Sequence, residues 1–328
     1  MANESLTLDT RTPPQLAAAH ADLRAVVAPS LIRVTETAAL ACARHIGRGN
    51  SDRLRAAASA AMLEALERLG IAGRVVLGPR GDQFLSHGTA VGESGLGRFD
   101  LAVYPVEGSS LVAKGMAGAI SLLVAVEPDS LPQLPAVWYA ERIVAGPAAR
   151  GTLALDEPLV DNLRRIAFAR DARVNDLAVA VLDRPRHNQL ISELRDVGAR
   201  IVLLEEGEIA GALLAASEGT GIDAMVGIGG LQETMIAACA TRCLGGELQA
   251  RLWPRNDEER VLAGPEAGQI LGLDDLSPEH VDVAVTGISG GPLLRGAWYG
   301  RQGAQTESLT MSTRFHTVRR ISTQHQEI

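Results

Sequence analysis

A group of polar residues follows a short apolar segment and has the chemistry to bind an ion. Residues 99–103 predict a buried strand with one acid near its start. Because Pro105 cannot continue a central hydrogen-bond ladder, we expect the strand to end at Tyr104. Ligands of open α/β sheets tend to bind at this carboxyl end of a strand. The turn expected there consists of Glu107, Gly108 and Ser109.

A second group of polar residues is basic. Residues 177–182 predict a strand and residues 189–197 a helix, and two arginines and a histidine lie between them. Cations beside a helix N-terminus suit an anion such as phosphate. A solvated basic turn is the alternative that these residues leave open. The basic residues are Arg184, Arg186 and His187.

Two later turns combine acids with glycines. Predicted strands at 201–204 and 223–228 each lead through such a turn into a predicted helix, at 210–216 and 234–244. This repeated strand–turn–helix order predicts a mixed or parallel sheet with helices on its faces. The glycines of 227–230 allow a backbone to approach a ligand closely. The acids of these two turns include Glu206, Glu208 and Glu233.

Composition argues against several classes of protein. The chain has 328 residues, is 46% hydrophobic and carries a net charge of −8 with acids spread along its length, which argues against a nucleic-acid surface. No apolar run approaches the about 20 residues needed to cross a membrane. Without a signal-peptide pattern, and with three sparse cysteines, the sequence predicts a cytoplasmic protein. Cys239 and Cys243 are expected to be core residues rather than metal ligands.

The order of predicted elements divides the chain into three parts. Residues 1–30 are expected to form an N-terminal tail and helix, residues 31–150 an N-terminal lobe, and residues 151–328 a C-terminal lobe with the basic and acidic turns. Within the last part, residues 247–280 read as polar and helical in places.

Nine short motifs, taken in order, resemble one family of enzymes. They fall between Leu31 and His325, and although each is weakly specific, the ordered set is specific. The motifs are RVTETAALA (33–41), GRGN (47–50), PVEGSS (105–110), ERIVAGP (141–147), RPRH (184–187), EEGEIA (205–210), GIGGLQE (227–233), VTGISGG (285–291) and TVRRI (317–321). Together they are similar to the class II fructose-1,6-bisphosphatases of bacteria.

The resemblance implies a layered α/β sugar-phosphatase fold of the α-β-α-β-α type, with mixed sheets flanked by helices, and a homo-oligomer. It also implies hydrolysis of the 1-phosphate of a ketose bisphosphate with Mg²⁺ or Mn²⁺. Such cations prefer oxygen ligands, offset charge on the phosphoryl group and lower the pKa of the attacking water. The residues that it implies bind the phosphorylated sugar are Gly108, Ser109, Tyr139, Arg142, Arg184, Arg186, His187, Glu206 and Glu208.

The sequence departs from the family pattern at the metal-binding positions. The aspartate of Gly-Arg-Gly-Asp is Asn50, and the first aspartate of Asp-Pro-Ile-Glu-Gly-Thr is Tyr104. Residues 79–81 are Pro-Arg-Gly where the family has Glu-Gly-Glu, so the two acids become Pro79 and Gly81, with a cation between them. Because attraction falls with each lost charge, we expect Mg²⁺ or Mn²⁺ to bind weakly. With Tyr104, the implied catalytic residues are the two remaining metal carboxylates, Glu107 and Glu233.

Three functions are consistent with these residues. The chain is either a sugar-phosphate phosphatase with a weakened or rebuilt metal centre, or an inactive relative that binds sugar phosphate or an active subunit in a regulatory role. The third alternative is a different reaction on a phosphosugar, with Tyr104 or His187 as the acid–base group. For the first function, the candidate replacement ligands are two nearby acids, Asp82 and Asp100.

Overall fold

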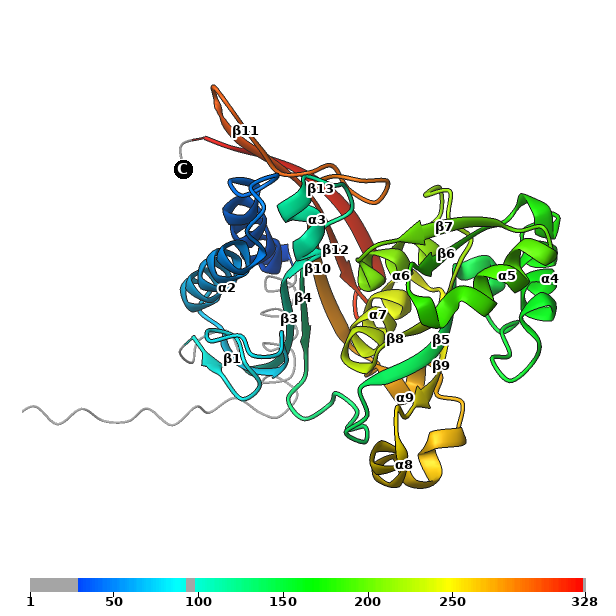
Figure 1. Cartoon of the computed structure of the whole chain (residues 1–328). Helices are drawn as coiled ribbons and strands as arrows, with labels where there is room; N and C mark the ends of the chain where they lie inside the picture. Colours follow the sequence, from blue (N-terminus) through cyan, green and yellow to red (C-terminus); the bar gives the residue numbers. More distant parts are fainter. Residues whose placement is uncertain (1–28, 93–97, 327–328) are drawn as a thin grey trace, which may run out of the picture.

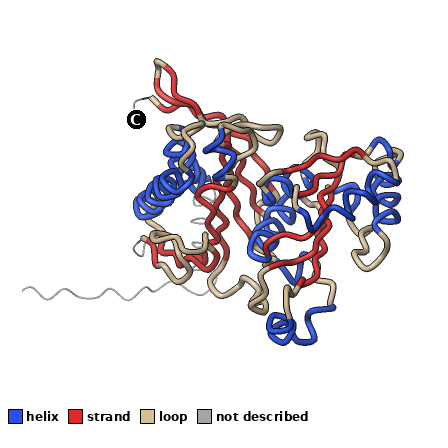
Figure 2. The backbone as a smooth tube through the Cα atoms, viewed as in Figure 1, coloured by secondary structure: helices blue, strands red, loops and turns tan. Residues whose placement is uncertain are grey.

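The computed structural model describes residues 29–92 and 98–326. The predicted N-terminal tail and helix, residues 1–30, therefore lies almost wholly outside the described residues. Two β-sheets and the helices packed against them make up the described part of the chain (Figure 2). None of the helices described is both long enough and apolar enough to cross a membrane.

The sheets and helices stack in an α-β-α-β-α order (Figure 1). A helix over residues 29–43 and α2 (Ser51–Arg68) cover the outer face of the first sheet. Helices α6 (Glu208–Ala216) and α7 (Leu231–Leu244) lie between the two sheets. Helices α4 (Leu159–Ala169) and α5 (Asn188–Asp196) cover the far face of the second sheet. The predicted layered α/β fold is confirmed.

The first sheet joins strands from both ends of the described chain. Its order is β11-β12-β10-β4-β3-β1-β2, with β13 paired to β12, and only the β1–β3 pair is parallel. Four strands come from residues 281–325, so the sheet does not coincide with the predicted lobe of residues 31–150. The strands are β1 (Ala72–Leu77), β2 (Ala90–Val91), β3 (Arg98–Glu107), β4 (Ile120–Val126), β10 (Val281–Gly287), β11 (Trp298–Gly300), β12 (Gly303–Ser312) and β13 (Thr317–His325).

The second sheet has the order β7-β6-β8-β5-β9, with β6 parallel to β7 and β8 and with β5 antiparallel to β8 and β9. The expectation of a polar, partly helical segment was wrong at its start, because residues 247–253 form an edge strand in which alternate side chains are buried. The strands are β5 (Tyr139–Ala145), β6 (Ala178–Leu182), β7 (Arg200–Leu204), β8 (Ala224–Gly230) and β9 (Glu247–Trp253).

Strand β4 shows how the layers are held together. Leu122, Val124 and Val126 point into the central core with α6 and α7, whereas Leu123 and Ala125 point into the outer core with α2. A strand covered on both faces needs an uninterrupted apolar run, as this one has. Each buried leucine or valine contributes roughly 1.5–3 kcal/mol. In α7, Cys239 packs in the central core and Cys243 packs against it, as expected.

Strand β3 does not end at Tyr104, as the sequence predicted, but continues through Pro105 to Glu107. Its pairing with β4 shifts register between Tyr104 and Glu107, and a proline fits such an irregularity because no ladder bond is required there. Gly108 then adopts a left-handed φ of 84° and turns the chain into α3 (Ser109–Lys114).

Short helices complete the described fold. Several of them contact strands β8 and β9 of the second sheet, and one lies between β6 and α5. They are α8 (Asp257–Ala263), α9 (Leu273–Leu276), η1 (Pro147–Ala149), η2 (Val174–Asp176), η3 (Pro185–His187) and η4 (Gly264–Gly268).

Candidate functional site

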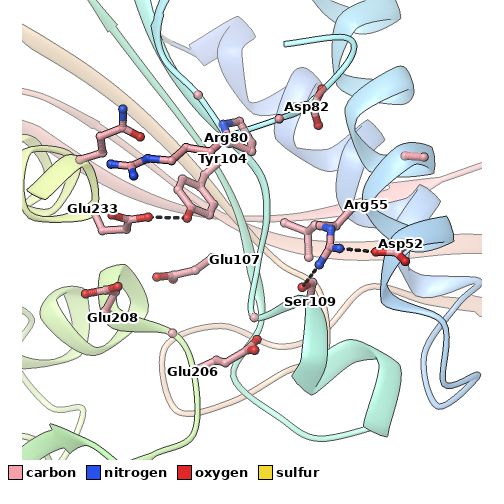
Figure 3. Close-up of a pocket in the computed structure, with 18 of the residues that line it drawn as sticks. Asp52, Arg55, Arg80, Asp82, Tyr104, Glu107, Ser109, Glu206, Glu208 and Glu233 are labelled. Carbon is pink, nitrogen blue, oxygen red and sulfur yellow. Dashed lines mark hydrogen bonds and ion pairs between the residues drawn. The ribbon is translucent and has the colours of Figure 1, made fainter. Parts of the chain in front are cut away.

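A cleft of ≈ 730 Å³ opens where the ends of β3, β6 and β7 face α2, the β1–β2 loop and the start of α7 (Figure 3). Most of the site residues predicted from sequence line it. Arg142 and His187 do not line it; both are buried, and each is about 1–2% exposed. The predicted residues in the cleft are Tyr104, Glu107, Gly108, Ser109, Tyr139, Arg184, Arg186, Glu206, Glu208 and Glu233.

Tyr104 and Glu233 form a direct pair across the cleft (Figure 3). The Tyr104 hydroxyl donates a 2.6 Å hydrogen bond to Glu233 Oε1. Burial and the negative charge of Glu233 raise the pKa of Tyr104 above its usual value, so the hydroxyl keeps its proton at neutral pH. Burial and the neighbouring Glu208 raise the pKa of Glu233. Tyr104 therefore acts as a hydrogen-bond donor at this position and not as a base.

Glu107 is buried at the end of β3 and uses both carboxyl oxygens to accept hydrogen bonds from the first turn of α6. The donors are the backbone N–H of Ile209 and, at 2.8 Å, that of Ala210. Such bonds complement the positive end of a helix dipole. Burial raises the pKa of Glu107 to about 8, although the two backbone bonds oppose this shift. Glu107 thus fastens the first sheet to the central helices.

Glu208 forms an ion pair on the opposite wall. Its Oε2 accepts a 2.6 Å bond from Arg142 Nη2 and a 3.0 Å bond from the Gly230 N–H. Arg142 Nη1 donates to Thr234 Oγ1 at 2.7 Å. The guanidinium is almost fully buried and is neutralised by Glu208, so it positions that carboxylate instead of meeting a ligand.

His187 has no free ring nitrogen. Its Nδ1 lies 2.8 Å from the Leu182 carbonyl, and its Nε2 accepts a 2.8 Å bond from the Ile228 N–H. These partners fix the neutral tautomer, and burial lowers the pKa of the ring. Gly227 has a φ of 126°, and a side chain there would press against the imidazole. His187 joins β6 to β8 and is not placed to act on a ligand.

Polar groups from three elements meet at the Ser109 end of the cleft. Arg55 of α2 donates to Ser109 Oγ at 3.2 Å and pairs with Asp52. Glu206 accepts a 3.0 Å bond from the Ser110 N–H at the start of α3. A carboxylate of this chain therefore occupies a backbone donor that would suit a phosphate oxygen.

Arginines supply the positive charge of the cleft. Arg184 donates to the Glu205 carbonyl at 2.8 Å, and Arg186 donates to the Ile228 carbonyl at 2.9 Å and lies over the Tyr139 ring. Backbone carbonyls hold both guanidinium groups without neutralising them, and neither forms an ion pair within the described ranges. Of the arginines that line the cleft, only these two were predicted from the sequence to bind a ligand.

Comparison with known proteins decides the family. The family model described as bacterial fructose-1,6-bisphosphatase, glpX-encoded, matches residues 25–325. The chain is 36% identical, over 90% of its length and 94% of the relative's, to a D-fructose 1,6-bisphosphatase class 2/sedoheptulose 1,7-bisphosphatase of Synechococcus sp. (strain JA-3-3Ab). It is 34% identical, over 92% and 96%, to fructose-1,6-bisphosphatase 1 class 2 of Escherichia coli (strain K12). The chain belongs to the class 2 fructose-1,6-bisphosphatase family.

Class 2 fructose-1,6-bisphosphatases are generally metal-dependent. The carboxylates in this cleft do not fit a divalent cation. Both oxygens of Glu107 accept hydrogen bonds from backbone N–H groups of α6, and Glu208 forms an ion pair with Arg142. Glu233 accepts the hydroxyl of Tyr104, which provides no charge. Across residues 29–92 and 98–326, no cluster of three or more His, Cys, Asp or Glu side chains is placed to hold a metal.

The two acids considered as replacement ligands lie elsewhere or are already bonded. Asp82 lines the cleft, but it accepts hydrogen bonds from Ser59 Oγ and from the N–H groups of Phe84 and Leu85. Asp100 is buried on β3, outside the cleft lining, where it accepts from Arg74. Neither restores the carboxylate cluster implied by the resemblance.

Two further residues were not predicted from the sequence, one in the cleft lining and one beside it. Arg55 lies one turn into α2, and its place just after the Gly47–Asn50 motif was the available signal. Trp138 precedes β5, and its ring lies beneath Arg80 at 3.3 Å from ring centroid to guanidinium carbon. No pattern pairs residues so far apart in the chain, because the contact depends on how the two sheets pack.

Proposed function

We propose that this member of the class 2 fructose-1,6-bisphosphatase family binds a phosphorylated sugar in the cleft and does not hydrolyse it by the metal-assisted route. The observation that carries this proposal is the pairing of the cleft carboxylates with donors of the chain itself, above all Glu233 with the Tyr104 hydroxyl.

The groups that favour a phosphorylated sugar lie on opposite elements of the cleft. Ser109 and Arg55 offer a hydroxyl and a guanidinium at the start of α3, while Arg184 and Arg186 offer two more guanidinium groups beyond β6. Guanidinium groups bind phosphate oxygens through paired, charge-assisted hydrogen bonds. The carboxylates of Glu206 and Glu208 are acceptors of the kind that sugar hydroxyls require.

Metal-assisted hydrolysis makes chemical demands that this cleft meets poorly. Displacement at a phosphate monoester needs the charge of the transferring group to be offset and the attacking water to be activated. Because acids are lost at residues 50, 79, 81 and 104, the two remaining carboxylates leave little to attract a divalent cation. The third function considered, acid–base chemistry by Tyr104 or His187, loses its support, because the hydroxyl stays protonated and both imidazole nitrogens are bonded to backbone.

Phosphate release and thermal stabilisation together test the proposal. The purified chain is incubated with fructose 1,6-bisphosphate, sedoheptulose 1,7-bisphosphate and sugar monophosphates in Mn²⁺, Mg²⁺ or EDTA. We expect stabilisation by at least one sugar phosphate in EDTA and no release of phosphate above the uncatalysed rate. Metal-dependent release would instead establish a phosphatase with a rebuilt centre. Absence of stabilisation by every compound would remove the binding role.

The proposal also covers the oligomeric state and the cellular location. We propose a homo-oligomer in the cytoplasm, as the family resemblance implies. Sedimentation velocity of the purified chain tests the oligomeric state, and fractionation of the source cells tests the location.

A further inference from the structure

The β1–β2 loop brings a cation to a place where the family pattern has acids. Residues 79–81 replace Glu-Gly-Glu with Pro-Arg-Gly, and Pro79, Arg80 and Gly81 all line the cleft. In Figure 3 the Arg80 side chain runs past Tyr104 toward the end of the cleft that contains Glu233. The loop therefore changes from a source of negative charge to a source of positive charge at the same site.

The backbone of the loop that carries Arg80 is held by contacts on both sides of this residue. Asp82 Oδ1 accepts from the N–H groups of Phe84 and Leu85, and its Oδ2 accepts from Ser59 Oγ of α2. At Gly78, a Cβ would lie 2.3 Å from the Leu85 carbonyl oxygen, so only glycine permits this close turn. These contacts occupy Asp82, which does not pair with Arg80.

The Arg80 guanidinium is stacked, not neutralised. Its central carbon lies 3.3 Å from the centroid of the Trp138 ring, and Arg255 lies 4.8 Å from that centroid. Stacking holds a guanidinium by its face and leaves the N–H donors at its edge available. Within the described part of the chain, Arg80 donates no hydrogen bond and forms no ion pair.

Resting on the proposed function, we propose that Arg80 takes over the electrostatic role of a divalent cation, so that the cleft binds the phosphate of its sugar ligand without metal. Tyr104 contributes to this change, because its neutral hydroxyl donates a hydrogen bond to Glu233 where an aspartate would add a negative charge. The ligand class is a sugar phosphate recognised by a stacked arginine, and its affinity is independent of Mg²⁺ and Mn²⁺.

Calorimetric titration with fructose 1,6-bisphosphate and with inorganic phosphate tests the inference. Arg80→Gln is compared with Arg255→Gln, which removes a guanidinium from the same tryptophan, but Arg255 is paired with Glu259 and does not line the cleft. We expect EDTA to change the wild-type affinity by less than about twofold, Arg80→Gln to weaken it by about tenfold or more, and Arg255→Gln to change it by less than about threefold. Thermal unfolding without ligand checks that both variants are folded.

The outcomes separate this inference from the proposed function. If the wild type binds in EDTA but Arg80→Gln binds as well as Arg255→Gln, the role of Arg80 is refuted and the binding function stands. The same holds if Mn²⁺ raises wild-type affinity tenfold. If the wild type binds none of the sugar phosphates, both proposals are refuted together.

Discussion

The Tyr104 hydroxyl lies 2.6 Å from Glu233 Oε1 and ties strand β3 of the first sheet to helix α7 between the sheets. Burial and the neighbouring carboxylate raise the pKa of Tyr104, so the donor is present throughout the neutral range. The tyrosine that departs from the family pattern thus donates a hydrogen bond to the glutamate that keeps it.

Tyr104→Phe should destabilise the fold, because it leaves a half-buried carboxylate oxygen of Glu233 without its donor. We expect the free energy of unfolding to fall by about 1–3 kcal/mol in urea denaturation. The hydroxyl lowers the pKa of Glu233, so its removal should also raise that pKa further. Tyr139→Phe is the control, since its hydroxyl donates no hydrogen bond among the described residues. Equal losses for the two variants would contradict the importance of this pair.

Glu107 should make stability depend on pH. Its pKa is raised from the usual 4.5 to about 8 in the folded chain, so the folded state holds a proton that the unfolded state releases. Stability should therefore fall as pH rises from about 5 to 8, by an amount on the order of 4 kcal/mol.

Glu107→Gln, which cannot ionise, should flatten this decline in a series of thermal melts. The exposed Glu218→Gln is the control and should keep the wild-type slope. A variant slope as steep as that of the wild type would assign the pH dependence to other groups.

Glu206→Ala should strengthen binding of phosphate at the start of α3. The Glu206 carboxylate now accepts from the Ser110 N–H and repels a second anion, so its removal frees a donor and removes a like charge. We expect phosphate affinity, measured by calorimetry, to rise by about three- to tenfold. Glu205→Ala removes the same charge from the adjacent residue, which pairs with Lys114 outside the cleft lining, and should have a smaller effect. A similar gain in both variants would indicate a general charge effect.

Restoring three acids should restore a metal site. Asn50→Asp keeps the cap of α2, because an aspartate also accepts from the Arg53 N–H, now bonded at 2.9 Å. Combined with Pro79→Glu and Tyr104→Asp, it should raise affinity for Mn²⁺ by at least about tenfold in a calorimetric titration. Asn50→Asp alone is the control and should gain little. If the triple variant folds, by circular dichroism, and binds no more tightly than wild type, the lost carboxylates do not explain weak metal binding.

Local sequence patterns predicted strands and helices correctly where an apolar run or a repeated strand–turn–helix order was clear. The apolar run of residues 177–182 gave the buried strand β6, and the strand–turn–helix order around Glu206 and Glu233 gave the second sheet. Two errors had local causes. In residues 247–253 the polar residues obscure an alternating strand pattern, and Pro105 suggests a strand end although β3 passes it at a register shift.

The layered α/β class, the family, and the loss of acids at residues 50, 79, 81 and 104 follow from the amino-acid sequence, because they depend on periodicity and on the order of residues along the chain. The tertiary structure alone decided which charges are free. In the folded chain, His187 and Arg142 are buried and bonded to other residues of the chain, and Glu107 accepts hydrogen bonds from α6. Arg80 stacks on the ring of Trp138. The reason is physical: whether a titratable side chain meets a ligand depends on hydrogen bonds and burial contributed by segments far away in the sequence.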